Sequence, residues 1–217
     1  MKNDYTHISI ILDRTGSMET IRDDTIGGFN TFLKDQKKEP GTATMTLVQF
    51  DTVDPYEIIH KFKPLQDVPE LTHETYVPRA STPLLDAMGR SINDIEKSIK
   101  DLSEEERPSK VVVVVITDGM ENASREFRRD QIIKMVKEKT DKDGWQFVFL
   151  SADLDAFMDA GRMGVMDHKR MMFAKNKMGS QRAWSGLSAS MSSYRSSAPR
   201  EDFKFDPDDQ KQSSSPS

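Results

Sequence analysis

Residues 111–119 read VVVVVITDG, and this stretch does most to decide the fold. An uninterrupted run of β-branched residues is typical of a strand that is buried on both faces of a parallel sheet. The turn-forming residues Thr117, Asp118 and Gly119 follow it directly. We therefore predict the central strand of the fold at 111–116, with a loop at its carboxyl end.

Strand-like and helix-like segments alternate on both sides of this strand. Short apolar runs predict further strands at 8–12, 42–50, 56–62, 147–150 and 171–173. Apolar residues at steps of three and four predict helices at 18–32, 83–102, 124–140, 154–162 and 177–194, with Ser124 as a helix cap. The alternation predicts an α/β fold: a doubly wound, mostly parallel central sheet flanked by helices, as in Rossmann-like proteins.

Composition narrows the function classes. The net charge of −5 offers no general attraction to nucleic acid or to an acidic membrane surface, so we expect neither as a partner. The chain has no cysteine, which excludes disulfide scaffolds, thiolate zinc sites and iron–sulfur clusters and leaves oxygen and imidazole as metal ligands. The apolar stretch 8–12 is too short for a secretion signal, and no run approaches the length of a membrane span. We expect a cytoplasmic protein.

The composition changes near the C-terminus. Hydrophobic residues make up 35% of the 217 residues, enough for one core, but the chain beyond Ser196 is dominated by Ser, Pro, Asp, Lys and Gln. Such a segment offers little apolar surface to offset the entropy lost on ordering. We therefore predict one domain over 1–195 and a disordered tail over 196–217.

Oxygen-bearing side chains gather where ligands bind in an open α/β sheet, outside the carboxyl ends of its strands. Asp13, Thr15 and Ser17 follow the first strand on alternate residues, so their side chains can converge. Thr82 begins a helix, and Asp118 follows the valine strand. Oxygen is the ligand that Mg²⁺ prefers. Because hydroxyl ligands are neutral, such an ion keeps positive charge with which to attract a carboxylate from another molecule.

This ordered set resembles the metal-ion-dependent adhesion site (MIDAS) of von Willebrand factor type A (vWA) domains, over about residues 6–194. In that family two hydroxyls of the first loop bind the metal, a threonine joins them when a ligand engages, and two aspartates hold the ion directly or through water. The resemblance implies Mg²⁺ or Mn²⁺ as the cofactor and the following metal ligands: Asp13, Thr15, Ser17, Thr82 and Asp118. It also suggests a stand-alone chain of the bacterial or bacteriophage type.

Two positions depart from the family pattern. Thr15 stands where the family usually has serine, which keeps the oxygen and adds a methyl group. Ala80 and Ser81 stand where many members have glycines before the threonine, so the path of that loop is a point for the structure to decide.

The resemblance implies a non-enzymatic, metal-dependent protein–protein interaction module. Its partner would be a protein that offers an Asp or Glu carboxylate, and similar intracellular domains act as adaptors in AAA+ ATPase systems. The alternative is a metal-dependent phosphohydrolase or nucleotide-binding enzyme that uses the same rim of the sheet. The chain lacks the glycine-rich phosphate loop and the G-x-S-x-G motif, and Ser17 has no histidine base in any motif around it. A third reading is a metal-free scaffold in which these residues only cap helices and turns.

Other polar residues have simpler interpretations. Asp51 and Asp54 flank the turn between the second and third strands, and we favour turn chemistry over a metal role for them. Glu121 and Asn122 follow Asp118 closely and are either supporting groups of the site or solvated loop residues. The four histidines show no zinc-site spacing, and we expect structural or surface roles for them: His7, His60, His73 and His168.

Overall fold

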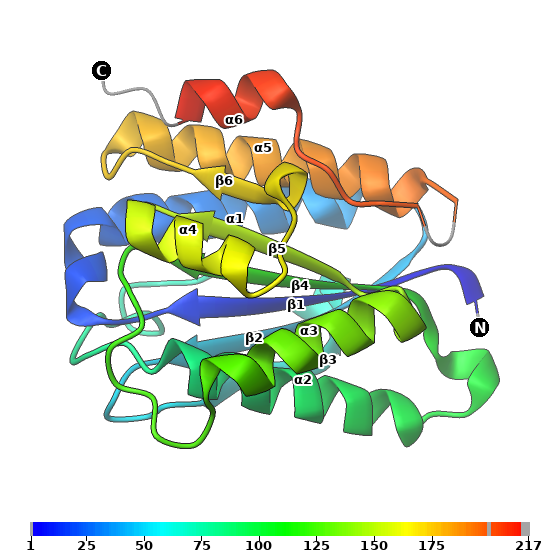
Figure 1. Ribbon diagram of the computed structural model, residues 1–217. Coiled ribbons are helices and arrows are strands. Elements are labelled where there is room, and N and C mark those ends of the chain that lie inside the picture. Colours follow the sequence, from blue (N-terminus) through cyan, green and yellow to red (C-terminus); the bar gives the residue numbers. More distant parts are fainter. Residues whose placement is uncertain (1, 199–200, 214–217) are drawn as a thin grey trace.

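The computed structural model describes residues 2–198 and 201–213 and contains a six-stranded sheet in the order β3-β2-β1-β4-β5-β6 (Figure 1). The strands are β1 (Lys2–Asp13), β2 (Thr42–Phe50), β3 (Glu57–Pro64), β4 (Pro108–Thr117), β5 (Gln146–Ser151) and β6 (Arg170–Met172). All neighbours pair in parallel except β3, which runs antiparallel to β2 at one edge. The predicted α/β fold class is confirmed, with β1 and the valine strand β4 at the centre.

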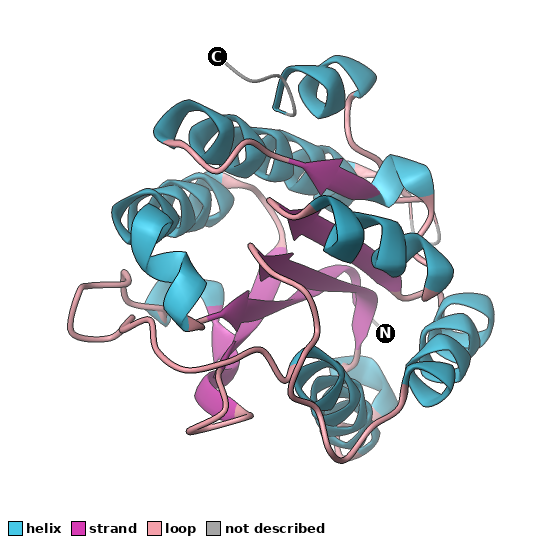
Figure 2. Ribbon diagram, turned by 60° about the vertical axis from the view of Figure 1, so that its left-hand side comes forward, coloured by secondary structure: helices cyan, strands magenta, loops and turns pink. Residues whose placement is uncertain are grey.

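Helices cover both faces of the sheet (Figure 2). They are α1 (Arg22–Lys38), α2 (Leu84–Lys100), α3 (Arg129–Asp143), α4 (Leu154–Arg162), α5 (Lys177–Ser196) and the short α6 (Pro207–Ser213), with short 3₁₀ helices such as η1 (Gly16–Ile21) between elements. Alternate β4 residues face opposite ways: Val112 and Val114 pack with α1 and α5, whereas Val113 and Val115 pack with α2, α3 and α4. No helix of the described residues is long and apolar enough to cross a membrane.

The start of α3 differs from the prediction, because the helix begins at Arg129 rather than after Ser124. Two carboxylates bind the backbone amides of the intervening loop. Asp86 accepts the amide hydrogens of 125–127 at 2.8–2.9 Å, and Glu121 accepts that of Ser124 at 2.7 Å. Because these side chains satisfy the amides, the loop needs no helical carbonyl partners and stays irregular.

The C-terminal segment also differs from the expected disordered tail. Phe203 and Phe205 are buried, and their backbone amides donate to the Gln146 side chain and to the His168 carbonyl at 3.1 and 2.8 Å. The helix α6 then lies against α5 (Figure 1). Two aromatic side chains anchor this segment, although its average composition is polar. Residues 199–200 and 214–217 of the predicted tail lie outside the described residues.

Candidate metal centre

Three loops at the carboxyl ends of the parallel strands form the candidate site. Asp13 is the last residue of β1, and Asp118 follows the last residue of β4. Since β1 and β4 are parallel neighbours, both carboxylates emerge at the same edge of the sheet. Thr82 lies two residues before α2 and approaches that edge from a third segment. The topology therefore brings the predicted loops together.

The loop after β1 is organised by the Asp13 carboxylate. Asp13 Oδ1 accepts a hydrogen bond from the Thr15 amide at 2.7 Å, and Oδ2 accepts one from the Thr117 hydroxyl at 2.6 Å. The Thr15 and Ser17 hydroxyl oxygens lie 3.2 Å apart, which shows that the alternate side chains converge as predicted. The Thr117 hydroxyl also contacts the backbone of Gly119, at 2.9 Å from its carbonyl oxygen and 3.2 Å from its amide nitrogen.

Asp118, Ser17 and Thr82 complete the cluster. The Ser17 hydroxyl donates to Asp118 Oδ1 at 2.6 Å. A Cβ placed on Gly119 would lie 3.7 Å from Ser17 Oγ and 3.9 Å from Thr82 Oγ1, so these two hydroxyls face the same point beside the glycine. The structure therefore gathers all five predicted ligand residues in one cradle, which a side chain at 119 would begin to fill.

Burial dominates the electrostatics of Asp13. Its side chain is fully buried, and this burial raises the pKa of its carboxyl to about 7, against the opposing hydrogen bonds from Thr117 and Thr15. The charge of nearby Asp118 raises it further. The hydrogen-bond donors to Asp13 are neutral, so they do not balance the negative charge that a deprotonated Asp13 would bring. A cation at this point would supply that balance.

The segment 79–83, which carries Thr82 and which we call the threonine loop, is held by hydrogen bonds to its backbone. Thr82 and Asn122 are paired twice: the Thr82 amide donates to Asn122 Oδ1 at 2.9 Å, and the Asn122 amide donates to the Thr82 carbonyl at 3.1 Å. The Gly16 amide donates to the Ala80 carbonyl at 3.1 Å, which joins this loop to the β1 loop. Ala80 has a φ of 60°, in the left-handed region that favours glycine. The replacement of glycine by Ala80 therefore leaves this position in the left-handed conformation that a glycine adopts readily.

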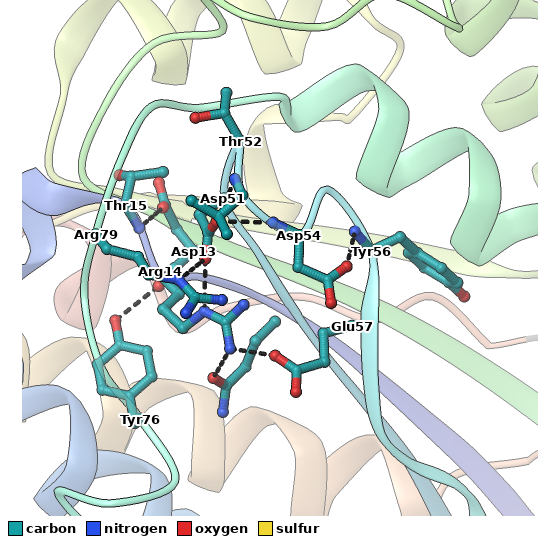
Figure 3. A network of polar contacts seen from close by, with 12 residues as sticks. Asp13, Arg14, Thr15, Asp51, Thr52, Asp54, Tyr56, Glu57, Tyr76 and Arg79 are labelled. Atoms are coloured by element: carbon teal, nitrogen blue, oxygen red, sulfur yellow. Dashed lines mark hydrogen bonds and ion pairs between the residues drawn. The ribbon is translucent and has the colours of Figure 1, made fainter.

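A second polar cluster lies beside the cradle, and sequence reasoning missed most of it (Figure 3). We call it the Asp51 cluster; its members are Arg14, Gln49, Asp51, Glu57 and Arg79. Asp51 Oδ2 accepts hydrogen bonds from Arg14 Nε at 2.8 Å and from Arg79 Nε at 2.9 Å, and Arg14 also contacts Gln49 and Glu57. Asp51 Oδ1 meanwhile accepts the amides of Val53 and Asp54 at 2.6 and 2.9 Å, which confirms the predicted turn role.

This cluster fastens two loops of the cradle to each other. Arg14 lies between Asp13 and Thr15 in the chain, and Arg79 belongs to the segment that leads to Thr82. The Arg79 amide also donates to the Arg14 carbonyl at 2.8 Å. The one signal in the sequence is the position of Arg14 inside the motif loop, where alternation points it away from the residues on either side.

The residues of the cradle fit a hard divalent cation. Within residues 2–198 and 201–213, no three His, Cys, Asp or Glu side chains form a metal group, so the available ligands are two carboxylates and three hydroxyls. All five are oxygen ligands, as Mg²⁺ and Mn²⁺ prefer, and bound waters commonly complete the coordination of Mg²⁺. Asp118 Oδ2 is buried and accepts no hydrogen bond of good geometry from the described residues, and the Lys175 ammonium lies 2.5 Å from it as an ion-pair partner.

An open depression of about 800 Å³ lies on the α2 side of the cradle. Its lining comes mostly from the segment before α2, from α2 and from the loop before α3, and includes Ser81, Pro83, Asn122, Ser124 and Arg125. Asn122 therefore borders the depression while it positions Thr82. A molecule that contacts the cradle can extend into this depression.

Comparison with solved structures places the fold among vWA domains. A von Willebrand factor type A protein from Catenulispora acidiphila superimposes with a TM-score of 0.56 at 8% identity, covering 86% of this chain and 42% of that one. The proximal thread matrix protein 1 of the mussel byssus, with a zinc-occupied MIDAS motif, superimposes with a TM-score of 0.58 at 12% identity, covering 88% of this chain and 46% of that one. The manganese-loaded TRAP protein of Plasmodium vivax superimposes with a TM-score of 0.54 at 12% identity, covering 81% of this chain and 71% of that one.

These likenesses establish a vWA-like fold. This chain spans less than half the length of the Catenulispora and mussel proteins. No protein-family model matches the sequence, and no curated protein matches it.

Proposed function

We propose that this protein is a metal-dependent protein–protein interaction module whose cradle holds Mg²⁺ or Mn²⁺. One observation carries the proposal: two buried carboxylates and three hydroxyls from three loops converge beside Gly119. The vWA-like fold supports it, because two structures of that fold, the mussel protein and the Plasmodium protein, are described with a zinc-occupied MIDAS and with manganese.

In this proposal each residue has a stated part. The five ligand residues are Asp13, Thr15, Ser17, Thr82 and Asp118. Thr117 orients the Asp13 carboxylate through its hydroxyl, and Asn122 positions the backbone of Thr82. The bound ion would supply an electrophilic position for one more oxygen, because three of its five protein ligands are neutral.

The partner would offer an Asp or Glu carboxylate to this position. A carboxylate is a hard oxygen ligand and therefore suits an open coordination position on such an ion. The depression beside Thr82 gives the neighbouring residues of the partner a place to bind. We propose that the chain works as a non-enzymatic adaptor in the cytoplasm, beside an AAA+ ATPase or a comparable assembly.

The test is isothermal titration of Mg²⁺ into the wild type, Asp118→Asn and Glu19→Gln. Asp118→Asn keeps the side-chain shape and removes the charge, so we expect a loss of affinity of about a hundredfold or more. Glu19 is an exposed acid two residues after Ser17, and its variant controls for the loss of one negative charge near the site. Equal affinity in all three proteins would refute the site.

Partner binding and turnover give two further readouts. Capture of partners by the wild type should require Mg²⁺ and should be lost in Asp118→Asn but kept in Glu19→Gln. Generic phosphoesters with Mg²⁺ should not be turned over. Turnover that Asp118→Asn abolishes would instead favour a phosphohydrolase on the same rim.

A further inference from the structure

A lysine that the sequence motif does not include reaches the centre of the cradle. Lys175 Nζ lies 2.5 Å from Asp118 Oδ2. The Asp118 side chain is fully buried, whereas the Lys175 side chain is 35% exposed. No described residue donates a well-aligned hydrogen bond to Asp118 Oδ2. The charge of the ammonium is therefore the main interaction of this oxygen.

The sheet topology explains how a residue so far along the chain arrives here. Lys175 follows β6, which is parallel to β5, as β5 is to β4. The carboxyl end of β6 therefore lies at the same edge as Asp118, two strand spacings or about 10 Å away. A lysine side chain is long enough to cover most of that distance, and a shorter side chain would not be.

The backbone on both sides of Lys175 is anchored. The Phe173 amide donates to the Ser151 carbonyl at 2.9 Å, and the Asn176 amide donates to the Ala174 carbonyl at 2.7 Å. A Cβ on Gly179 would come within 2.3 Å of the Ala174 carbonyl oxygen, so the start of α5 packs tightly on this turn. The backbone is therefore held on both sides of Lys175, and its partly exposed side chain has the room to turn.

We propose that Lys175 is a tethered counter-cation of the metal cradle, which a divalent ion must displace from Asp118 in order to bind. The inference rests on the proposed function and deepens it by assigning a competitor to the site. An ammonium and a divalent ion repel each other at such short range and require the same carboxylate. The exposed stem of Lys175 lets its ammonium turn into solvent when the ion enters, while the anchored backbone keeps it at the rim.

The competition lowers the affinity of the cradle for the ion and stabilises the metal-free protein. Without a metal, Lys175 balances the buried charge of Asp118. With a metal, that balance passes to the ion. The protein therefore has two charge-compensated states, and the lysine sets the metal concentration at which one replaces the other.

The experiment compares wild type with Lys175→Met and with Lys177→Met as the matched control. Lys177 is an exposed lysine two residues further on, so its variant makes the same change in net charge. We expect Lys175→Met to bind Mg²⁺ about tenfold more tightly than wild type in isothermal titration, and Lys177→Met to stay within about twofold of it. In EDTA, Lys175→Met should unfold at a lower temperature than the control, and Mg²⁺ should raise its midpoint by more.

Each outcome decides the matter. Binding by Lys175→Met alone would support the competition in its strongest form. Equal affinity of wild type and both variants would overturn the counter-cation and leave the proposed function standing, whereas no binding by any of the three would overturn both. If Lys175→Met does not fold in EDTA, Lys175→Gln replaces it, because glutamine keeps a hydrogen-bond donor for Asp118. Lys175→Gln should also bind Mg²⁺ more tightly than wild type. An affinity equal to that of wild type would refute the counter-cation role of Lys175.

Discussion

Asp51 and Asp13 are two fully buried carboxylates at the same edge of the sheet, yet their pKa values move in opposite directions. Burial raises the pKa of Asp13 to about 7. Burial by itself would also raise the pKa of Asp51, but the backbone amides of its turn and the Arg79 guanidinium hold it below its ordinary value. Both side chains are inaccessible to solvent, but Asp51 lies less deep in the protein and has cationic partners that Asp13 lacks.

The difference separates a carboxylate whose charge is already balanced from one whose charge is not. Asp51 is paired with two guanidinium groups that stay charged at any physiological pH. Asp13 is bound by neutral donors and lies near a second carboxylate, Asp118, whose cationic neighbour is a partly exposed lysine. A cation from solution would add nothing at Asp51, whereas under the proposed function it would balance the charge of the cradle.

The largest expected effect comes from breaking the structural cluster. Asp51→Ala should lower the free energy of unfolding by about 3 kcal/mol, because it leaves the buried Arg14 with only Gln49 and the half-exposed Glu57. Urea denaturation measures this change. Asp54→Ala, which removes a single 3.3 Å hydrogen bond to the Tyr56 amide, should cost about 1 kcal/mol or less. Equal losses in the two variants would mean that the arginine pairing contributes nothing.

The next effect tests the neutral donors of Asp13. Thr117→Val keeps the shape of the side chain and removes the hydroxyl that binds Asp13 Oδ2, so the affinity for Mg²⁺ should fall by about tenfold to a hundredfold. Isothermal titration gives the value. Thr6→Val is the matched control, because Thr6 is also buried but lies seven residues earlier on β1, about 23 Å from the site. A similar fall in both variants would show that the hydroxyl does not orient the carboxylate.

The smallest effect concerns pH. Since the pKa of Asp13 is raised to about 7, a proton competes with the metal below that pH, and the affinity for Mg²⁺ should be about tenfold weaker at pH 6 than at pH 8. Asp51, whose pKa is lowered, stays ionised throughout this range and adds nothing to the change. Titrations in buffers of different ionisation enthalpy would count the proton released at pH 6. A constant affinity without proton release would contradict the assignment of Asp13.

The sequence predicted more of the cradle than of its surroundings. Asp13, Thr15 and Ser17 could be found because they lie on alternate residues at the end of one strand, and Asp118 because it directly follows the run of valines. Thr82 lies at the predicted start of a helix. The structure brings these five together: the parallel strands β1 and β4 fix the edge at which the loops of Asp13 and Asp118 emerge, and the segment before α2 brings Thr82 to the same edge.

The residues that sequence reasoning missed all act across long separations. Arg79 and Asp51 are 28 positions apart in the chain. Lys175 follows β6 and reaches Asp118, which follows β4, two strands away. The packing of Phe203 and Phe205 was likewise hidden by the polar composition around them. Such pairs leave no periodic pattern, because neither partner is recognisable without the other.

The sequence by itself determined the α/β alternation, the central valine strand and the loops that carry the oxygen ligands, because these depend on local periodicity and on the order of elements. Only the tertiary structure decided which charges meet. The electrostatics of a buried carboxylate depend on the few groups within several ångströms, and those groups come from distant segments. The same residue type is therefore paired with guanidinium groups at Asp51 and bound only by neutral donors at Asp13.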